Sequence, residues 1–343
     1  MTGRTGRDGW ADEGVFEVAS GVHRIPLPLP SDGLRAVNVY VVAGDDGPVL
    51  IDSGWAIAAA REQLGNGLRE LGYELPDVRR FLVTHAHRDH YEQAVHLRRE
   101  FGASVSLGAG EQPSLELLQR ADGHPFDPQL RLLTALGAAS LAETIAAQVV
   151  DVGADPEDWQ SPDTWLQDGD IAIAGDRALT VVPTPGHTTG HVVFHDRADA
   201  LLFTGDHVLP TITPSVGFEP VLSPTALSDF LGSLARVRQL PDALLLPAHG
   251  PVSPSVHARV DELLEHHDVR LAQTLGYVGA GADTGLDVAS SLRWTRHERR
   301  LDELNPFNQL LALAETAAHL DLLVAQGRVT CAIEDGVRHY QAA

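Results

Sequence analysis

The sequence contains no lysine: all 25 of its basic residues are arginine, against 47 Asp and Glu, so the formal net charge of the 343 residues is −22. A surface this acidic works against binding to nucleic acids and to anionic membranes. A single cysteine, Cys331, excludes an internal disulfide and a zinc site made of several cysteines. No apolar run is long enough to cross a membrane, and the polar start MTGRTGRDGWADEG does not resemble a secretory signal. We therefore expect a cytoplasmic protein.

What the sequence does contain is alternating strand and helix patterns, with 43% hydrophobic residues to form a core. The segments AVNVYVVAG, PVLIDSG and VRRFLVTH predict strands, and AIAAAREQLGNGLRELGY predicts a helix between them. Further strands are predicted in DIAIAG, ALTVVPTPGH, HVVFHDRADALLFTGDH and ALLLPAHG. This order indicates an α/β protein in which two mixed sheets pack together with helices outside.

Changes in composition divide the chain. Residues 1–13 are predicted to be a disordered leader, and residues 14–255 to form the main domain. Within it, the Ala- and Leu-rich segment 112–160 predicts a helical insertion over one edge of the sandwich. Helices followed by the hairpin RVTCAIEDGVRHYQ predict a small winged-helix-like domain over residues 256–343.

The densest signal is THAHRDH, in which three histidines and an aspartate follow an apolar run directly. On a strand, residues i and i+2 face the same side, so His85 and His87 can reach one metal ion, and Asp89 and His90 a second one nearby. Their donor atoms suit Zn²⁺, and also Fe or Mn. Three more candidates follow apolar strands beside glycines: His187 in TPGHTTGH, Asp206 in FTGDH and His249 in LPAHG.

Any one of these three residues alone would more often be an ordinary hydrogen-bonded side chain. Their occurrence in this order, each after a strand, favours one shared metal site. The other histidines, among them His191 and His207, are expected beside the ligands or on the surface.

THAHRDH resembles the HxHxDH signature of the metallo-β-lactamase superfamily, and LIDSG, PGHTTGH, TGDH and AHG resemble its other motifs in the same order. The resemblance covers residues 15 to about 252. It implies an αββα sandwich with a dinuclear metal centre at one edge. The implied ligands are His85, His87 and His187 for the first ion, Asp89, His90 and His249 for the second, and Asp206 as a bridge between the two.

Two further residues are singled out by the same motifs. Asp52 matches a residue that supports the site without binding metal. Tyr91 and Glu92 stand where two small residues, commonly glycines, usually follow the signature. Tyr91 therefore either narrows the cleft and reaches a substrate, or packs at the start of a helix.

Two divalent ions with Asp89, Asp206 and a bridging hydroxide would carry a charge of about +1, which favours anionic or polarised substrates. A metal ion lowers the pKa of bound water to roughly 7 and so provides a hydroxide nucleophile. We expect a metal-dependent hydrolase with Asp89 and Asp206 as catalytic residues and a small ester, thioester or lactone as substrate. The expected cofactors are two divalent ions, with Zn²⁺ preferred over Fe or Mn.

Other functions stay open at this stage. The C-terminal region resembles that of a winged-helix-bearing subgroup of β-lactamase-like proteins, some of which are single-strand endoribonucleases. However, residues 251–343 contain 8 Arg against 13 Asp and Glu, a net charge of −5, so nucleic acid is not the expected partner. A regulator with a retired hydrolase domain and a di-iron oxidoreductase are further alternatives. The sequence leaves self-association open.

Overall fold

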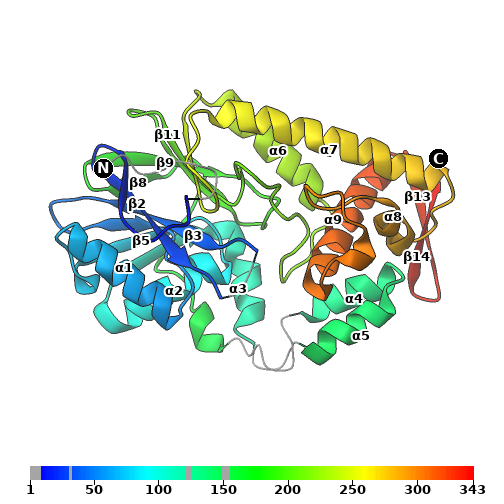
Figure 1. Cartoon of the computed structure of the whole chain (residues 1–343), viewed down its shortest axis with the longest axis horizontal. Coiled ribbons are helices and arrows are strands. Elements are labelled where there is room, and N and C mark those ends of the chain that lie inside the picture. The colour runs from blue at the N-terminus through cyan, green and yellow to red at the C-terminus, as the bar shows by residue number, and fades with distance from the viewer. Residues whose placement is uncertain (1–8, 31–32, 121–125, 149–154) are drawn as a thin grey trace.

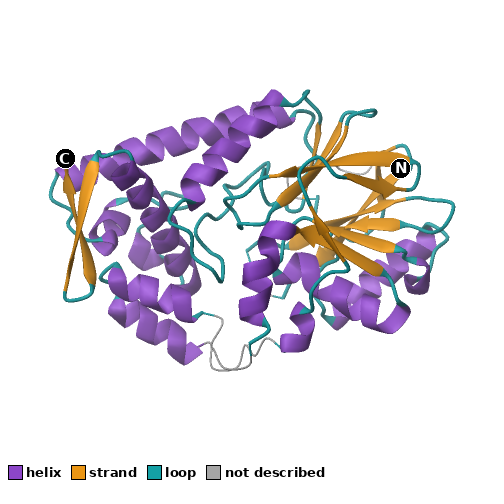
Figure 2. Cartoon of the chain, turned by 180° about the vertical axis from the view of Figure 1, so that it is seen from behind, coloured by secondary structure: helices purple, strands orange, loops and turns teal. Residues whose placement is uncertain are grey.

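The computed structural model describes residues 9–30, 33–120, 126–148 and 155–343. Two sheets packed face to face occupy one side of the molecule, and a group of helices occupies the other (Figures 1 and 2). This is a mixed α/β architecture, as the sequence predicts. None of the helices in the described residues combines the length and apolar character that a membrane crossing requires.

The first sheet has seven strands. In spatial order they are β1 (Phe16–Ala19), β2 (Val22–Pro28), β3 (Ala36–Val42), β4 (Val49–Ile51), β5 (Arg80–Val83), β6 (Ser104–Gly108) and β7 (Thr164–Leu166). Strands β1 to β4 pair antiparallel, and β4 to β7 pair parallel. The parallel strands require crossover connections, two of which are the helices α1 (Ala58–Glu70) and α2 (Arg88–Phe101).

The second sheet has five strands in the order β12-β11-β10-β9-β8. They are β8 (Ile171–Ala174), β9 (Arg177–Pro183), β10 (Val192–Asp196), β11 (Leu201–Gly205) and β12 (Leu244–Pro247). All neighbours pair antiparallel except β11 and β12, which are parallel and are connected through α6 (Ala226–Gln239).

Strand β3 shows how the layers are specified. Every residue of AVNVYVV is buried, because alternate side chains point into two different cores. Val37, Val39 and Val41 pack toward α1 and α2, whereas Tyr40 and Val42 pack between the sheets. The second sheet is covered on its outer face by α6 and by α7 (Val256–Gly279), whose apolar residues share a core with β10 and β11.

The insertion does not lie where the sequence suggests. Helix α3 (Gln112–Leu118) stays with the sandwich, but α4 (Asp127–Ala135) and α5 (Ala139–Gln148) pack against α9 (Pro306–Ala325) in the helical half. Leu133, Leu136 and Ile145 share one core with residues of α9 such as Leu310. The expected position over one edge of the sandwich is therefore wrong for α4 and α5. Residues 121–125 and 149–154 of the predicted insertion lie outside the described residues.

The C-terminal region consists of α7, α8 (Gly285–Ser291), α9 and the hairpin β13 (Val329–Glu334) and β14 (Val337–Ala342). Its assignment as a winged-helix-like domain stays a prediction. Four short 3₁₀ helices complete the described elements: η1 (Leu75–Asp77), η2 (Ala109–Glu111), η3 (Pro156–Trp159) and η4 (Leu301–Glu303).

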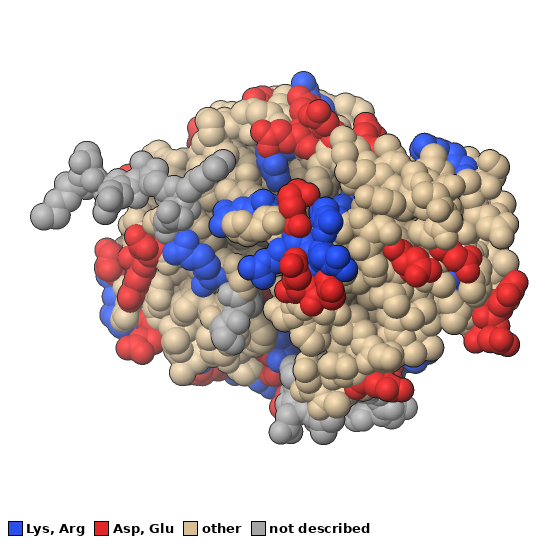
Figure 3. Space-filling view, turned by 45° about the vertical axis from the view of Figure 1, so that its right-hand side comes forward, with Lys and Arg blue, Asp and Glu red and all other residues tan. Residues whose placement is uncertain are grey.

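Of the predicted leader, residues 1–8 lie outside the described residues, but residues 9–13 form turns and bends. The Trp10 carbonyl accepts a hydrogen bond of 2.6 Å from Arg24, so disorder is wrong for this part. Figure 3 shows one face of the molecule, on which arginines gather near the middle among carboxylates. The negative net charge is thus unevenly distributed over the surface.

Candidate metal centre

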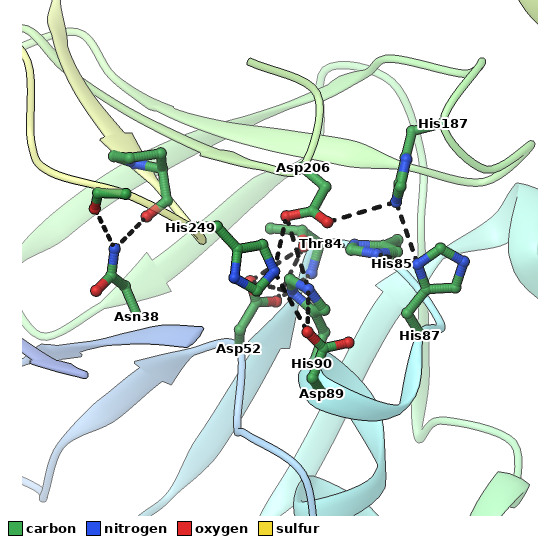
Figure 4. Close-up of polar contacts among 12 residues, drawn as sticks. Asn38, Asp52, Thr84, His85, His87, Asp89, His90, His187, Asp206 and His249 are labelled. Atoms are coloured by element: carbon green, nitrogen blue, oxygen red, sulfur yellow. Dashed lines mark hydrogen bonds and ion pairs between the residues drawn. The ribbon is translucent and has the colours of Figure 1, made fainter. Parts of the chain in front are cut away.

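The topology brings the sequence motifs together at one edge of the sandwich. Strands β4 and β5 are parallel, as are β11 and β12, so the carboxyl ends within each pair lie at the same edge. Asp52 follows β4, the HxHxDH segment follows β5, Asp206 follows β11 and His249 follows β12. His187 lies in the turn between β9 and β10. Figure 4 shows that these side chains point toward one another from both sheets.

The donor atoms form two clusters. Ligating atoms of His85, His87, His187 and Asp206 lie within 4.8 Å of one another, and so do those of Asp89, His90 and His249. All seven predicted ligands are therefore brought together. One part of the prediction is wrong: β5 ends at Val83, so His85 and His87 lie on the turn after the strand, and this turn rather than strand alternation aims them at one point.

Hydrogen bonds fix the ring tautomers of the first cluster. His187 Nδ1 lies 2.8 Å from the Ser215 carbonyl, which can only accept, so this nitrogen donates. The hydroxyl of Thr84 donates to Asp52, so it accepts from His85 Nδ1 at 3.1 Å. The Nε2 atoms of both neutral rings therefore present lone pairs.

These lone pairs converge on His87. Its Nδ1 lies 3.0 Å from His85 Nε2 and 3.1 Å from His187 Nε2, and a proton on it can satisfy only one of them. Nitrogen ligands at ~2.0–2.1 Å from a tetrahedral Zn²⁺ would lie ~3.3 Å apart. The three rings thus fit a cation better than they fit one another.

Hydrogen bonds to other groups orient the two imidazole rings of the second cluster. His90 Nδ1 donates to Asp52 Oδ2 at 2.9 Å, and His249 Nδ1 donates to the Ala36 carbonyl at 2.8 Å. Their Nε2 atoms face carboxylates: His249 Nε2 lies 3.3 Å from Asp89 Oδ2, and His90 Nε2 lies 3.6 Å from the same atom. Both Nε2 atoms are buried and have no hydrogen-bond partner. A buried imidazole nitrogen beside carboxylates therefore favours a positive charge between them, either a proton on the ring or a bound cation.

Asp206 lies between the two clusters. Its Oδ2 is 3.5 Å from His187 Nε2, and its Oδ1 is 3.4 Å from His249 Nε2 and 3.7 Å from His90 Nε2. Oδ1 is also buried without a hydrogen-bond partner. The residue before Asp206 is Gly205. A Cβ at this position would lie 2.6 Å from Thr84 Oγ1, so only glycine lets the backbone approach Thr84 this closely.

The local charges affect the two clusters in opposite directions. Burial, together with the neighbouring imidazoles, lowers the pKa of His85 and His187 well below 6.5, so these rings are neutral. Burial also lowers the pKa of His90 and His249, but the carboxylates of Asp89 and Asp206 outweigh it and raise these values to about 10 and about 9. The surroundings of the second cluster thus attract positive charge.

Asp52, for which the resemblance implies a supporting role, lies beside the second cluster. It accepts from the backbone N–H of Thr84 at 2.8 Å and from His90, and it is buried. Its φ of 60° is one that aspartate tolerates better than most residues. Asn38 plays a similar part for His249, because its side-chain amide donates to the Pro247 and Gly250 carbonyls on either side (Figure 4).

Several supporting residues were missed from the sequence. The hydroxyl of Thr188 donates to the buried Glu111, and Thr189 donates to Glu219 through its backbone N–H at 2.9 Å. Both bonds anchor the turn that carries His187. A Cβ at Gly190 would lie 2.0 Å from the Glu111 backbone nitrogen, which shows how closely this turn packs. In the sequence, the second glycine of PGHTTGH, Gly190, was the signal that could have indicated this close contact.

Two residues with open roles are now placed. Tyr91 is buried in the core between the first sheet and its helices, and its hydroxyl donates to the Gln160 carbonyl. This agrees with the packing alternative and does not support contact with a substrate. His191 is buried, stacks on His85 at 5.0 Å between ring centroids, and accepts from the Asp206 backbone N–H at 3.2 Å.

A cavity of about 920 Å³ opens at the opposite ends of the strands, beside Gly47, Arg79 and Arg177. Among the residues that the structure describes, the groupings of potential metal ligands are the two at the other edge. The chemistry is therefore assigned to that edge despite the size of this cavity.

Comparison with known proteins agrees with this geometry. A family model of the metallo-beta-lactamase superfamily matches residues 32–249. The chain is 25% identical over 330 residues to "Probable metallo-hydrolase YqjP" of Bacillus subtilis (strain 168), which covers 90% of this chain and 92% of that protein. It is 28% identical over 241 residues to the acyl-coenzyme A thioesterase MBLAC2 of Homo sapiens, covering 68% of this chain and 79% of that protein.

Solved structures extend the likeness to nearly the whole chain. A metallo-beta-lactamase family protein from Thermus thermophilus superposes with a TM-score of 0.79 at 28% identity, covering 95% of this chain and 100% of that one. A beta-lactamase domain protein from Burkholderia ambifaria gives a TM-score of 0.78 at 26% identity, covering 96% and 94%. The chain belongs to the metallo-β-lactamase superfamily and is one of its hydrolases, with His and Asp clusters suited to divalent metal.

Proposed function

We propose that this chain is a dinuclear metal-dependent hydrolase that cleaves small esters, thioesters or lactones. The observation that carries the proposal is the convergence of unpartnered imidazole and carboxylate atoms in two adjacent clusters, with Asp206 facing both. Zn²⁺ suits these donors, and Fe or Mn would suit them as well.

In this proposal the residues divide into two sets. His85, His87 and His187 would hold the first ion, Asp89, His90 and His249 the second, and Asp206 both. When bound, the ions would supply an activated water as nucleophile and a Lewis acid that polarises the carbonyl oxygen. No serine or cysteine nucleophile is then needed.

The protein's own groups orient the site and move a proton. Asp52 keeps the His90 ring turned so that Nε2 faces the pocket, and the Ala36 and Ser215 carbonyls do the same for His249 and His187. Side-chain exposure is 15% for Asp89 and 9% for Asp206. We assign to Asp89 the transfer of the released proton toward solvent, because its carboxylate is the more accessible of the two.

An acyl substrate is favoured over a phosphodiester. Helix α9 contains no arginine, and the chain contains no lysine, so this helix offers no cation to grip phosphates. One of the relatives is named an acyl-coenzyme A thioesterase, which supports thioesters in particular. The single-strand endoribonuclease remains the competing function in the test below.

The test combines metal analysis with a substrate panel. We expect the purified protein to contain close to two zinc-like ions per chain and to hydrolyse thioester, ester or lactone probes. Removal of the metal with a chelator should abolish this activity, and added Zn²⁺ should restore it. A metal-loaded protein that left all acyl probes intact and cut single-stranded RNA would establish the nuclease instead.

A further inference from the structure

Three phenylalanines from distant parts of the chain meet beside the candidate metal centre. Phe126 precedes the first turn of α4, Phe218 lies in the loop between β11 and α6, and Phe307 lies in the first turn of α9. The ring centroids of Phe218 and Phe126 are 6.0 Å apart, and those of Phe218 and Phe307 are 5.5 Å apart. We call these three rings the aromatic wall. Figure 1 shows the starts of α4 and α9 close together in the helical half.

The aromatic wall adjoins a predicted metal ligand. The ring centroid of Phe218 lies 6.4 Å from that of His87. Phe218 is positioned by its neighbours, because the Ser215 carbonyl accepts from His187 and the Glu219 carboxylate accepts from Thr189. The same loop therefore orients a ligand and places an aromatic ring beside it.

The wall remains partly open to solvent. Phe126 and Phe218 are half-buried, and the side chain of Phe307 is 48% exposed. Apolar rings that are open to solvent beside a polar site are typical of surfaces that bind an apolar ligand. None of the three rings can bind a phosphate or a sugar through hydrogen bonds.

We propose that the aromatic wall binds the apolar acyl chain of the substrate, while the carbonyl that is attacked lies at the metal centre. This inference rests on the proposed function and specifies its substrate as an acyl compound with a medium-length apolar chain. The two centroid distances limit the span from His87 to Phe307 to about 12 Å. Burial of one methylene corresponds to roughly a fourfold gain in binding, so kcat/KM should rise with chain length until the wall is covered.

The experiment compares chain-length preference in Phe307→Ala and the wild type. Acetyl, hexanoyl and decanoyl thioesters of one thiol serve as substrates, so that only the acyl part changes. We expect the wild type to prefer decanoyl over acetyl, and Phe307→Ala to lower this ratio of kcat/KM values about tenfold. Ile333→Ala, which truncates an exposed apolar side chain on β13, is the control and should keep the wild-type ratio.

A binding measurement separates this inference from the proposed function. Isothermal titration of the metal-free protein with decanoate should show binding that Phe307→Ala weakens about tenfold, with acetate as the short-chain comparison. Decanoate binding that depends on Phe307 would support the wall even if every acyl probe stayed intact. If Phe307→Ala and the wild type hydrolysed thioesters with the same decanoyl-to-acetyl ratio of kcat/KM values, binding of the acyl chain by the aromatic wall would be contradicted. The proposed hydrolase function would still be supported.

Discussion

The two clusters of the candidate metal centre present their imidazoles in different electrostatic surroundings. In the first cluster, three imidazole rings face one another, and burial keeps the pKa of each below 6.5, so the rings are already neutral. In the second, His90 and His249 face carboxylates that raise their pKa values. Because a metal ligand must be deprotonated, binding at the second cluster has to displace protons, whereas binding at the first does not. We therefore expect the metal affinity of the second cluster to depend more steeply on pH.

The largest effect should come from the residue that the clusters share. Asp206→Ala removes the carboxylate that faces both, so we expect kcat/KM to fall by at least about 10³-fold and the metal content to fall with it. Metal analysis and acyl-thioester kinetics on the same preparation would measure both. A fully active Asp206→Ala protein would be incompatible with a bridging role.

A smaller effect, confined to the second cluster, should come from Asp52→Asn. Its amide can turn an N–H toward His90 Nδ1, and the ring must then protonate Nε2, which faces the pocket. We expect metal affinity at the second cluster to fall 10- to 100-fold, with most of the activity recovered in excess Zn²⁺. Competition with a chelator would measure the affinity. Asp45→Asn, at an exposed position, is the control, and equal losses in both variants would contradict the assignment.

The smallest effect on metal binding should come from Glu111, which anchors the turn of the first cluster and whose substitution acts on stability instead. Burial raises the pKa of Glu111 from 4.5 to about 8. Between these pH values the folded protein keeps a proton that the unfolded chain releases, so the contribution of Glu111 to stability is lost as the pH rises from about 4.5 to 8. Glu111→Gln should remove this slope and make the metal-free protein more stable than wild type at pH 8, by on the order of 4 kcal/mol.

Urea unfolding of the metal-free proteins at pH 5 and pH 8 would measure the difference. Glu116→Gln, at an exposed position on α3, is the matched control and should follow the wild type. Parallel pH profiles for wild type and Glu111→Gln would show that Glu111 does not titrate in this range.

The sequence predicted the sandwich and the residues that cluster at its edge because both depend on local patterns. Apolar strands that end in short polar motifs define the carboxyl edge of a sheet, and the parallel pairing of β4 with β5 and β11 with β12 brings those ends together. The family, once recognised from five motifs in order, supplied the grouping of the ligands. The strand-end motifs and the family's grouping together predict that the seven candidate ligands lie close to one another.

The sequence could not predict the contacts that orient the ligands. Ala36 and Ser215 act through carbonyl oxygens, which every residue possesses, so no side-chain pattern marks them. Glu111 and Glu219 lie in no motif. The leucine and alanine pattern of the insertion specified an apolar helix face but not its partner, and α4 and α5 pack on α9 rather than on the sandwich.

This packing also affects how the chain can fold during synthesis. Helices α4 and α5 bury their apolar faces against α9, which begins about 160 residues after α5 ends. Until α9 emerges from the ribosome, those faces lack their native cover and are available for aggregation. A chain shortened to the segment matched by the family model would keep every candidate ligand of the two clusters, yet it would leave these two helices permanently uncovered.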